Sequence, residues 1–491
     1  MHTPAFPAGH SLDPADWSGL RRLAHGMLED LFNDLEGLRD GPAWQPMPDV
    51  VRASWQSGAM PRAPRAANLV YQDYRERIAP YATGNRHPGF MGWVHGGGCV
   101  AGVLGEMLAA GLNANLGGRD HAPIACEREV VRWAAEMLGL PATSSGLLVT
   151  GTSIANFMAV LVARHRALGD QMRHAGVGDC RLTGYAAAGV HGCVGRAFDM
   201  AGLGTDALRL VACDAAGAMD LAALQGAIAR DIADGFRPFM VIGTAGSVDI
   251  GAIDDLAGVA AICAAAGLWF HVDGAFGAAA MLAPALRPRF NGIERADSVA
   301  FDFHKWFQVP YDAGCLVVRD AAAHRAAFDQ PARYLRRSAR GLAGGDPWPC
   351  DLGPDLSRGF RALKVWMTLK IHGADRLGEV AQHCCDLAQH LAAAIDASDL
   401  LERVAPVVLN IVCFRFRGGD DALQADIAAD VQETGVAVPS TTIIGGRLAL
   451  RAAIVNHRTE RRDIDALVAA VLEAGLQSRA RAAESGASTS R

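Results

Sequence analysis

Residues 268–280 (LWFHVDGAFGAAA) and 298–314 (SVAFDFHKWFQVPYDAG) decide the fold and indicate the chemistry of this chain. In the first stretch an apolar run ends in His271-Val272-Asp273, and in the second an apolar run ends in His304-Lys305-Trp306. Each run has the length and composition of a buried strand. Because the carboxyl ends of parallel strands meet at one edge of a sheet, we expect Asp273 and Lys305 to share that edge.

An amine and a carboxylate at one sheet edge have two interpretations. A lysine there can form a Schiff base with an aldehyde, and a buried carboxylate can keep a pyridine nitrogen protonated, as a pyridoxal phosphate site requires. The alternative is an internal ion pair between Asp273 and Lys305. A buried ion pair is weak evidence for a stabilising role, because desolvation offsets the attraction. The pattern therefore favours a functional site over a structural ion pair.

A third segment, residues 146–164 (GLLVTGTSIANFMAVLVAR), predicts a strand, a tight turn and a helix. Gly151, Thr152 and Ser153 fall at the expected start of the helix, where free N–H groups and the helix dipole favour a bound phosphate. Serine and threonine are also common there as simple caps. The position of this segment ahead of the Asp273 and Lys305 strands favours phosphate binding.

Short apolar runs alternate with alanine-rich helical patterns from about residue 96 to residue 320, which predicts a parallel or mixed sheet covered on both faces. The expected strands are Gly146–Thr150, Leu208–Ala212, Phe239–Thr244, Leu268–Val272, Ser298–Phe301 and Gly314–Val318.

Four regions are expected along the chain. Residues 1–95 form a helical arm, with a helix at Trp17–Leu38, and an extended connection; residues 96–375 form a large domain; residues 376–481 form a small α+β domain; and residues 482–491 form a disordered tail. Helical periodicity runs from Phe360 to His390, after an irregular segment from Phe328 to Gly359. The small domain is expected to contain a strand within 407–416, helices at Asp421–Thr434 and Asp463–Ala474, and a strand at Arg447–Val455.

The composition excludes several classes of protein. The 491 residues include 46 Lys and Arg against 52 Asp and Glu, and the net charge of −6 gives no reason to expect nucleic acid or an anionic membrane as a partner. The eleven cysteines include no C-x-x-C pair, which argues against a structural zinc site and a secreted disulfide framework, and for buried thiols in a reducing compartment. No metal is expected. Without a recognisable signal peptide or an apolar run long enough to span a bilayer, we expect a cytoplasmic protein.

In its motifs the chain resembles the group II pyridoxal phosphate-dependent decarboxylases, a family that includes the aromatic-L-amino-acid, histidine and glutamate decarboxylases. The motifs that carry the resemblance are RHPGFMG, APIACEREVVRWAAEMLGLP, the turn GTSIAN, GTAGSVDIGAIDDL, HVDGAFG, DFHKW and SRGFRALKVWMTLKIHG, in this order over nearly the whole chain. The resemblance implies a fold type I, transferase-like enzyme with a mainly parallel seven-stranded sheet, pyridoxal 5'-phosphate as cofactor and a homodimer.

The resemblance also implies roles for individual residues. Lys305 holds the cofactor covalently and Asp273 partners its pyridine nitrogen, while His191 stacks on its ring, although a histidine in a loop is otherwise more often structural. The remaining cofactor contacts implied are Thr152, Ser153, Ala275, Ser247 and His304. Tyr334 matches a loop tyrosine that completes decarboxylation; without the resemblance it would be as well explained as a surface tyrosine. His87, Phe90 and Trp93 are expected in the substrate pocket.

Some positions depart from the family. Asp302-Phe303 replaces the frequent Asn-Pro before His-Lys, and Val248 stands where a second threonine is common. Gly89, Gly92, Gly117 and Gly118, with Arg119-Asp120-His121, stand where aromatic decarboxylases carry rings, so an aromatic substrate is not assumed.

The expected function is α-decarboxylation of an L-amino acid to its amine and CO2. Two rivals remain open: another pyridoxal phosphate reaction, such as oxidative deamination to an aldehyde or carbon–carbon lysis, and a dimer that binds the cofactor without turnover. Tyr334 argues against the oxidative branch, because the family's aldehyde-forming members lack that tyrosine. The intact set of Lys305, Asp273 and His191 argues against the non-catalytic dimer.

Overall fold

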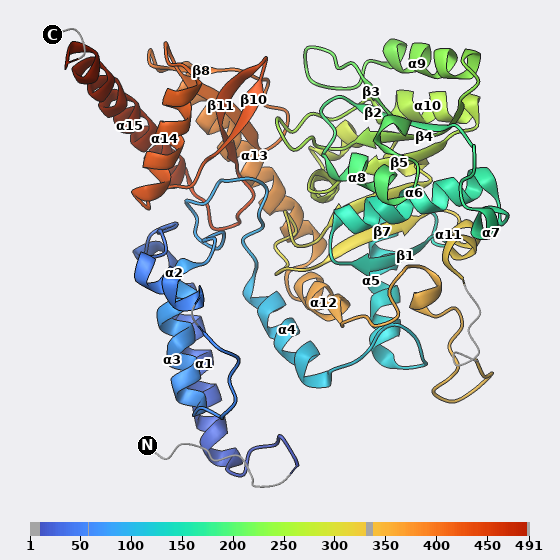
Figure 1. The fold of residues 1–491 in the computed structure, drawn as a ribbon, viewed down its shortest axis with the longest axis horizontal. Coiled ribbons are helices and arrows are strands. Elements are labelled where there is room, and N and C mark those ends of the chain that lie inside the picture. Colours follow the sequence, from blue (N-terminus) through green and yellow to red (C-terminus); the bar gives the residue numbers. More distant parts are fainter. Residues whose placement is uncertain (1–9, 57, 330–336, 489–491) are drawn as a thin grey trace.

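The computed structural model describes residues 10–56, 58–329 and 337–488, with side chains described up to residue 481. Figure 1 shows a helical N-terminal arm, a large domain and a small domain. The large domain is built around a seven-stranded sheet and the small domain around a four-stranded sheet. In the part of the chain so described, no helix is both long and apolar enough to cross a membrane. The fold type I architecture expected from the sequence is confirmed.

The arm contains three helices, α1 (Trp17–Glu36), α2 (Asp49–Gln56) and α3 (Ala67–Arg77). α1 and α3 lie side by side (Figure 1), held by a 2.7 Å hydrogen bond from the Tyr71 hydroxyl to Asp30 and by an ion pair between Arg75 and Asp34. The arm extends away from the two sheets, so much of its apolar surface faces outward.

The large sheet has the strand order β1-β7-β6-β5-β4-β2-β3. All neighbouring strands pair in parallel except β7, which is antiparallel to both β1 and β6. The strands are β1 (Ser145–Val149), β2 (Leu182–Ala187), β3 (Leu208–Val211), β4 (Arg237–Thr244), β5 (Trp269–Asp273), β6 (Ser298–Asp302) and β7 (Gly314–Val318). The six strands expected from the apolar runs are all present, with β2 in addition.

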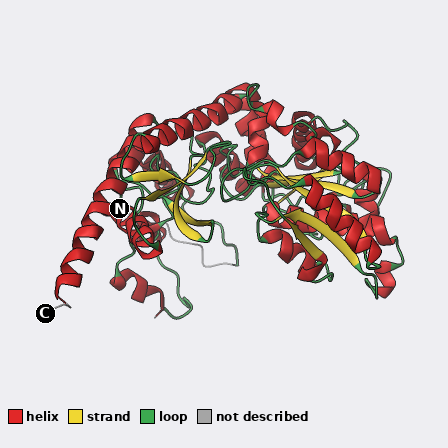
Figure 2. Ribbon diagram, turned by 90° about the horizontal axis from the view of Figure 1, so that it is seen from above, coloured by secondary structure: helices red, strands yellow, loops and turns green. Residues whose placement is uncertain are grey.

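Helices cover both faces of this sheet, as Figure 2 shows. Alternate side chains of the strands point to opposite faces and enter two separate apolar cores. One face carries α6 (Thr152–Leu168), α8 (Cys193–Met200) and α11 (Ala321–Phe328), with the short α7 (Met172–Ala175) nearby. The other carries α5 (Ala122–Leu138), α9 (Leu221–Ala233), α10 (Leu256–Ala266) and α12 (Arg361–His372), and α4 (Val100–Leu112) packs on α12.

The small domain is an antiparallel sheet in the order β10-β11-β9-β8, packed on helices. Its elements are α13 (Ala374–Asp396), β8 (Leu401–Arg403), β9 (Ile411–Phe416), α14 (Asp421–Glu433), β10 (Ser440–Ile444), β11 (Arg447–Ala453) and α15 (Arg461–Ser488). Two expectations differ from the structure. The helical stretch 360–390 is broken at Gly373, whose φ of 76° ends α12, and α15 continues to Ser488, through most of the segment expected to be disordered.

Candidate active site

A cavity of about 530 Å³ lies at the carboxyl edge of the large sheet. Its walls come from the end of β5, the turn after β6, the start of α6 and the segment before α4. This is the edge at which the sequence placed the ligand. Of the residues expected to contact the cofactor, those that line the cavity are Thr152, Ser153, His191, Asp273, Ala275, His304 and Lys305.

Lys305 is the lysine of this cavity. The chain has only three lysines, and the other two are engaged elsewhere: Lys364 pairs with Glu106 at 2.8 Å, and Lys370 lies over two tryptophan rings. The Nζ atom of Lys305 lies 3.0 Å from a carboxylate oxygen of Asp302. The alternative interpretation of the sequence paired Lys305 with Asp273. Among the described residues, Lys305 forms its ion pair with Asp302 instead.

Asp302 also joins the lysine to the start of α6. Its other oxygen accepts a 2.7 Å hydrogen bond from the Thr152 N–H, so the carboxylate caps a helix whose own N-cap position is glycine. The sequence left open what this position contributes to phosphate binding. The carboxylate occupies one backbone donor of the turn and orients the Lys305 amine.

The start of α6 and the end of β4 provide further groups that suit a phosphate. The hydroxyl oxygens of Thr152 and Thr244 are buried and have no hydrogen-bond partner among the described residues. Gly314 of β7 lies so close to the turn that a Cβ there would stand 2.4 Å from the Cα of Gly151. Buried hydroxyls rarely stay unpaired, so these atoms and the start of α6 fit an anionic ligand in the cavity.

Asp273 is buried at the end of β5. Its carboxylate accepts a 2.9 Å hydrogen bond from the Asn156 amide and one of 3.1 Å from the Ala275 N–H. Burial raises the pKa of the Asp273 carboxyl, while the Asn156 hydrogen bond and the positive charge of Lys305 act in the opposite direction. A carboxylate in this setting gains from a positively charged partner in the cavity.

The two histidines expected to contact the cofactor have different surroundings. His304 is buried; its Nδ1 accepts a hydrogen bond from the Ala313 N–H, and its ring lies 4.3 Å from that of Tyr311. Burial lowers the pKa of His304. His191 is exposed at the cavity wall, with its Nδ1 accepting a hydrogen bond from the Cys193 N–H.

Four of the predicted residues lie elsewhere or cannot be placed. Ser247 is buried beside the cavity, where its hydroxyl accepts from the Ala252 N–H and closes a turn. His87 faces a different cavity beside the arm, and Phe90 is buried behind the ring of His95. Of the expected substrate pocket only Trp93 lines the cavity. Tyr334 lies outside the described residues.

The structure adds residues that the sequence did not suggest. His95 and Tyr311 line the cavity with their rings, and Thr244 contributes its unpaired hydroxyl. Asn156 contacts Asp273 from α6. The polar residues at alternate positions of β5, and an asparagine inside an apolar helix, were the available signals for this last contact.

The motif PIACE has a structural explanation. Glu127 is buried on α5 and forms a bidentate ion pair with the buried Arg358, which comes just before α12. The Arg358 guanidinium also donates to the Leu148 carbonyl of β1, and the Leu148 N–H donates to Glu127. These bonds hold β1 in place, the strand that leads into the turn before α6.

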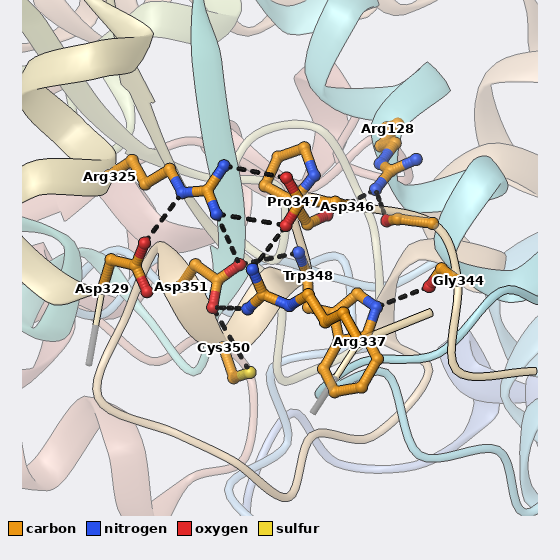
Figure 3. A network of polar contacts seen from close by, with 11 residues as sticks. Arg128, Arg325, Asp329, Arg337, Gly344, Asp346, Pro347, Trp348, Cys350 and Asp351 are labelled. Carbon is orange, nitrogen blue, oxygen red and sulfur yellow. Dashed lines mark hydrogen bonds and ion pairs between the residues drawn. The ribbon is translucent and has the colours of Figure 1, made fainter. Parts of the chain in front are cut away.

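A second polar cluster flanks residues 330–336 on both sides (Figure 3). Arg325 pairs with Asp329 at 3.0 Å and, through two hydrogen bonds, with Asp346. Arg337 pairs with Asp346 and with the buried Asp351, whose carboxylate also accepts from the Trp348 N–H at 2.8 Å. Arg325 and Arg337, which lie on opposite sides of residues 330–336, therefore both pair with the buried carboxylate of Asp351.

Known proteins with similar sequences are pyridoxal-dependent enzymes, as the residues of the cavity indicate. The family described as "pyridoxal-dependent decarboxylase conserved domain" matches residues 51–417. Tryptophan decarboxylase 2 of Oryza sativa subsp. japonica is 29% identical over 93% of this chain and 94% of its own length, and the aromatic-L-amino-acid decarboxylase of Bacillus atrophaeus is 28% identical over 90% and 92%. Phenylacetaldehyde synthase of Arabidopsis thaliana is 28% identical over 93% and 96%.

Solved structures agree in fold. The crystal structure of Oryza sativa TDC with PLP and tryptamine superposes with a TM-score of 0.87 at 24% identity, covering 95% of this chain and 99% of that chain. The glutamate decarboxylase domain of a Vibrio parahaemolyticus protein superposes with a TM-score of 0.83 at 26% identity, covering 94% and 97%.

The cavity fits the cofactor that these similarities imply. It offers the Lys305 amine, the buried Asp273 carboxylate, and the start of α6 with the unpaired hydroxyls of Thr152 and Thr244, which match the aldehyde, the pyridine nitrogen and the phosphate of pyridoxal phosphate. With the family match over residues 51–417, the chain belongs to the pyridoxal-dependent decarboxylases.

Proposed function

We propose how this pyridoxal phosphate-dependent enzyme uses its cavity to convert an L-amino acid to an amine and CO2. When bound, the cofactor supplies an electron sink for the carbanion that remains at Cα after the carboxyl group leaves. The observation that carries the proposal is the convergence of Lys305, Asp273 and the start of α6 on one cavity.

Each of these residues has a separate task. Lys305 holds the cofactor covalently through its Nζ and is oriented by Asp302. Asp273 accepts a hydrogen bond from the ring nitrogen and keeps it protonated. Thr152 and Ser153 hold the phosphate, with the buried Thr152 hydroxyl as a donor. His191, at the cavity wall, packs on the ring.

Tyr334 is proposed as the donor of the proton that Cα receives. The support is its place in the sequence, 29 residues after Lys305, and the resemblance of this stretch to the decarboxylases. A tyrosine hydroxyl can act as a general acid when it is held at the reacting carbon. The relatives include a phenylacetaldehyde synthase, so aldehyde formation is the rival reaction to be measured.

The substrate is proposed to be an L-amino acid with an aromatic side chain. Trp93, His95 and Tyr311 bring three rings to the cavity, and His95 stacks on Trp93 at 5.6 Å between ring centres. Rings of this kind favour a planar apolar group by stacking. The tryptophan, tyrosine and aromatic-L-amino-acid decarboxylases among the relatives support this substrate class.

A cytoplasmic homodimer is the proposed form of the enzyme. Support for the dimer comes from the apolar side chains that the arm and α4 leave exposed, among them Trp17, Val50 and Leu112. The eleven cysteines form no disulfide among the described residues, and this supports a cytoplasmic location.

The covalent assignment is tested by borohydride reduction of the enzyme loaded with pyridoxal phosphate. Digestion and mass spectrometry should find the reduced cofactor on Lys305. Lys305→Ala should abolish the label and turnover, whereas Lys370→Ala, at a lysine that lies over tryptophan rings, should keep both. Label on Lys364 or Lys370 in the unaltered enzyme would refute the assignment.

The reaction is tested with a pool of L-amino acids, measuring CO2, amines and aldehydes together. We expect amines from aromatic substrates. In Tyr334→Phe, CO2 release should persist while amine formation falls by roughly 10²- to 10⁴-fold, the size of a general acid's contribution. Unchanged amine per CO2 would show that Tyr334 is not the donor, and amine from acidic substrates alone would refute the substrate class.

A further inference from the structure

Behind Asp273 lies a row of buried polar side chains that the proposed chemistry does not use. Trp269, His271 and Asp273 occupy alternate positions of β5 and so lie on one face of the strand. Ser298, the first residue of β6, pairs in register with His271, and Asn156 of α6 packs over the same face. All five side chains are buried.

The five side chains form one continuous series of hydrogen bonds. The Trp269 indole donates to the Ser298 hydroxyl at 2.8 Å, and that oxygen lies 2.8 Å from Nδ1 of His271. Nε2 of His271 lies 2.8 Å from the Asn156 side-chain oxygen, and the Asn156 amide nitrogen donates to Asp273 at 2.9 Å.

With Asp273 ionised, only one direction of this series satisfies every atom. Trp269 can only donate, so the hydroxyl proton of Ser298 is free to point at Nδ1 of His271. His271 then carries its proton on Nε2 and donates it to the oxygen of Asn156. A reversed Asn156 amide would turn its oxygen toward the Asp273 carboxylate, where two acceptors would repel each other. The neutral state of His271 agrees with its burial, which lowers its pKa to about 3.

We propose that Asn156 and His271 are positioning residues, which hold Asp273 as an ionised, fixed acceptor for the ring nitrogen of the cofactor. This inference rests on the proposed role of Asp273. Desolvation favours the neutral form of a buried carboxyl, and a neutral Asp273 could not keep a pyridine nitrogen charged. The amide hydrogen bond from Asn156 favours the ionised form, and His271 fixes which end of the amide faces Asp273.

The test reads the protonation of the ring nitrogen directly. Enzyme loaded with pyridoxal phosphate labelled with ¹⁵N in the ring is observed by NMR between pH 6 and 9, because the ¹⁵N shift separates a protonated from a neutral pyridine. In Asn156→Ala we expect the pKa of the ring nitrogen to fall by about one to two units, the size of a lost hydrogen bond to a charged group. Asn410→Ala removes a buried asparagine whose amide donates to a carbonyl in the small domain, and should leave the shift unchanged.

Two further variants separate the possible outcomes. Asp273→Asn should give a neutral nitrogen; a nitrogen that stays protonated there would refute the proposed role of Asp273 itself. If Asp273→Asn behaves as expected but a folded, loaded Asn156→Ala keeps the wild-type shift, the positioning role is refuted. His271→Gln should lower the pKa in the same direction and decides the matter if Asn156→Ala does not fold.

An activity measurement gives an independent check. In a cofactor analogue with carbon in place of the ring nitrogen, Asp273 has no proton to hold. The loss of kcat caused by Asn156→Ala should therefore be large with pyridoxal phosphate and small with the analogue. An equal loss with both cofactors would indicate a general structural defect and would overturn the proposal.

Discussion

The buried, unpaired hydroxyl of Thr152 indicates that the cavity binds a phosphate. Oγ1 of Thr152 has no partner among the described residues, so Thr152→Val, which keeps the shape, should leave the melting temperature of the cofactor-free protein unchanged or slightly raised. The same change should weaken pyridoxal phosphate binding by about 10- to 100-fold, because a hydrogen bond to a charged phosphate is lost. Equilibrium titration of cofactor absorbance measures the affinity; unaltered affinity would show that the hydroxyl does not reach the phosphate.

His324 makes stability depend on pH. Its Nδ1 lies 2.7 Å from the Ser145 hydroxyl, and burial lowers its pKa to about 4. The unfolded chain binds this proton near pH 6.5 and therefore holds more protons than the folded state between about pH 6.5 and 4. The contribution of His324 to stability is thus fully present above pH 6.5 and is lost as the pH falls.

His324→Gln keeps a polar group beside Ser145 but cannot titrate in this range. We expect the loss of melting temperature between pH 7.5 and pH 5 to be smaller in this variant than in the unaltered protein, by the equivalent of about 2 kcal/mol. Differential scanning calorimetry at the two pH values measures the difference. Equal losses in both proteins would show that His324 is not a source of the acid sensitivity.

Single residues were predictable where a motif placed them at a strand end. The sequence brought Lys305 and Asp273 to one edge because the apolar runs before them end there, and the structure places both in one cavity. The sequence did not predict Asn156 and His271, since their contact depends on how α6 lies across β5. Position 302 was recognised as unusual, but only the fold shows its carboxylate between Thr152 and Lys305.

At the scale of elements, the cluster around Asp351 should stabilise the chain on both sides of residues 330–336. Asp351 is buried and accepts from both Arg337 and the Trp348 N–H, so Asp351→Asn leaves these donors poorly paired. We expect a loss of about 1–3 kcal/mol and faster tryptic cleavage after Arg337 and Arg340. Thermal unfolding and timed proteolysis measure the two effects.

Asp346 provides the matched control. It pairs with Arg325 and Arg337, but half of its side chain is exposed. Exposed ion pairs contribute little because solvent screens them, so Asp346→Asn should cost less than about 1 kcal/mol. If both variants lose the same stability, the burial of Asp351 is not the reason that the cluster stabilises the fold.

The accuracy of the predicted strands follows how continuous their apolar runs are. β2 (LTGYAA) is buried at every position but was not predicted, because threonine and glycine interrupt its apolar run. Strands in the middle of the large sheet were predictable, because β5, β6 and β7 are buried on both faces and appear as continuous apolar runs. The strands β8 and β10 were not, since each is an edge strand with an interrupted apolar pattern. Gly373 was a visible helix breaker, yet the apolar periodicity continues across it from α12 into α13.

At the scale of the whole molecule, the arm and α4 present apolar surface that the single chain does not cover. Met107, Leu108 and Leu112 of α4 are each at least half exposed, and so are Trp17 and Val50 of the arm. Exposed apolar surface on this scale is typical of protein interfaces. Because α4 follows directly on the segment that carries Trp93 and His95, the interface is expected to lie next to the active site.

Light scattering should therefore give a mass of two chains of 51.6 kDa at micromolar concentration. Leu108→Asp places a charge in the proposed interface and should shift the protein toward the monomer, with a loss of activity that is partly regained at high protein concentration. Leu476→Asp on α15 changes a leucine of equal exposure outside this surface and should remain a dimer. A fully active species of one chain, in either the unaltered protein or Leu108→Asp, would show that the site is complete within a single chain.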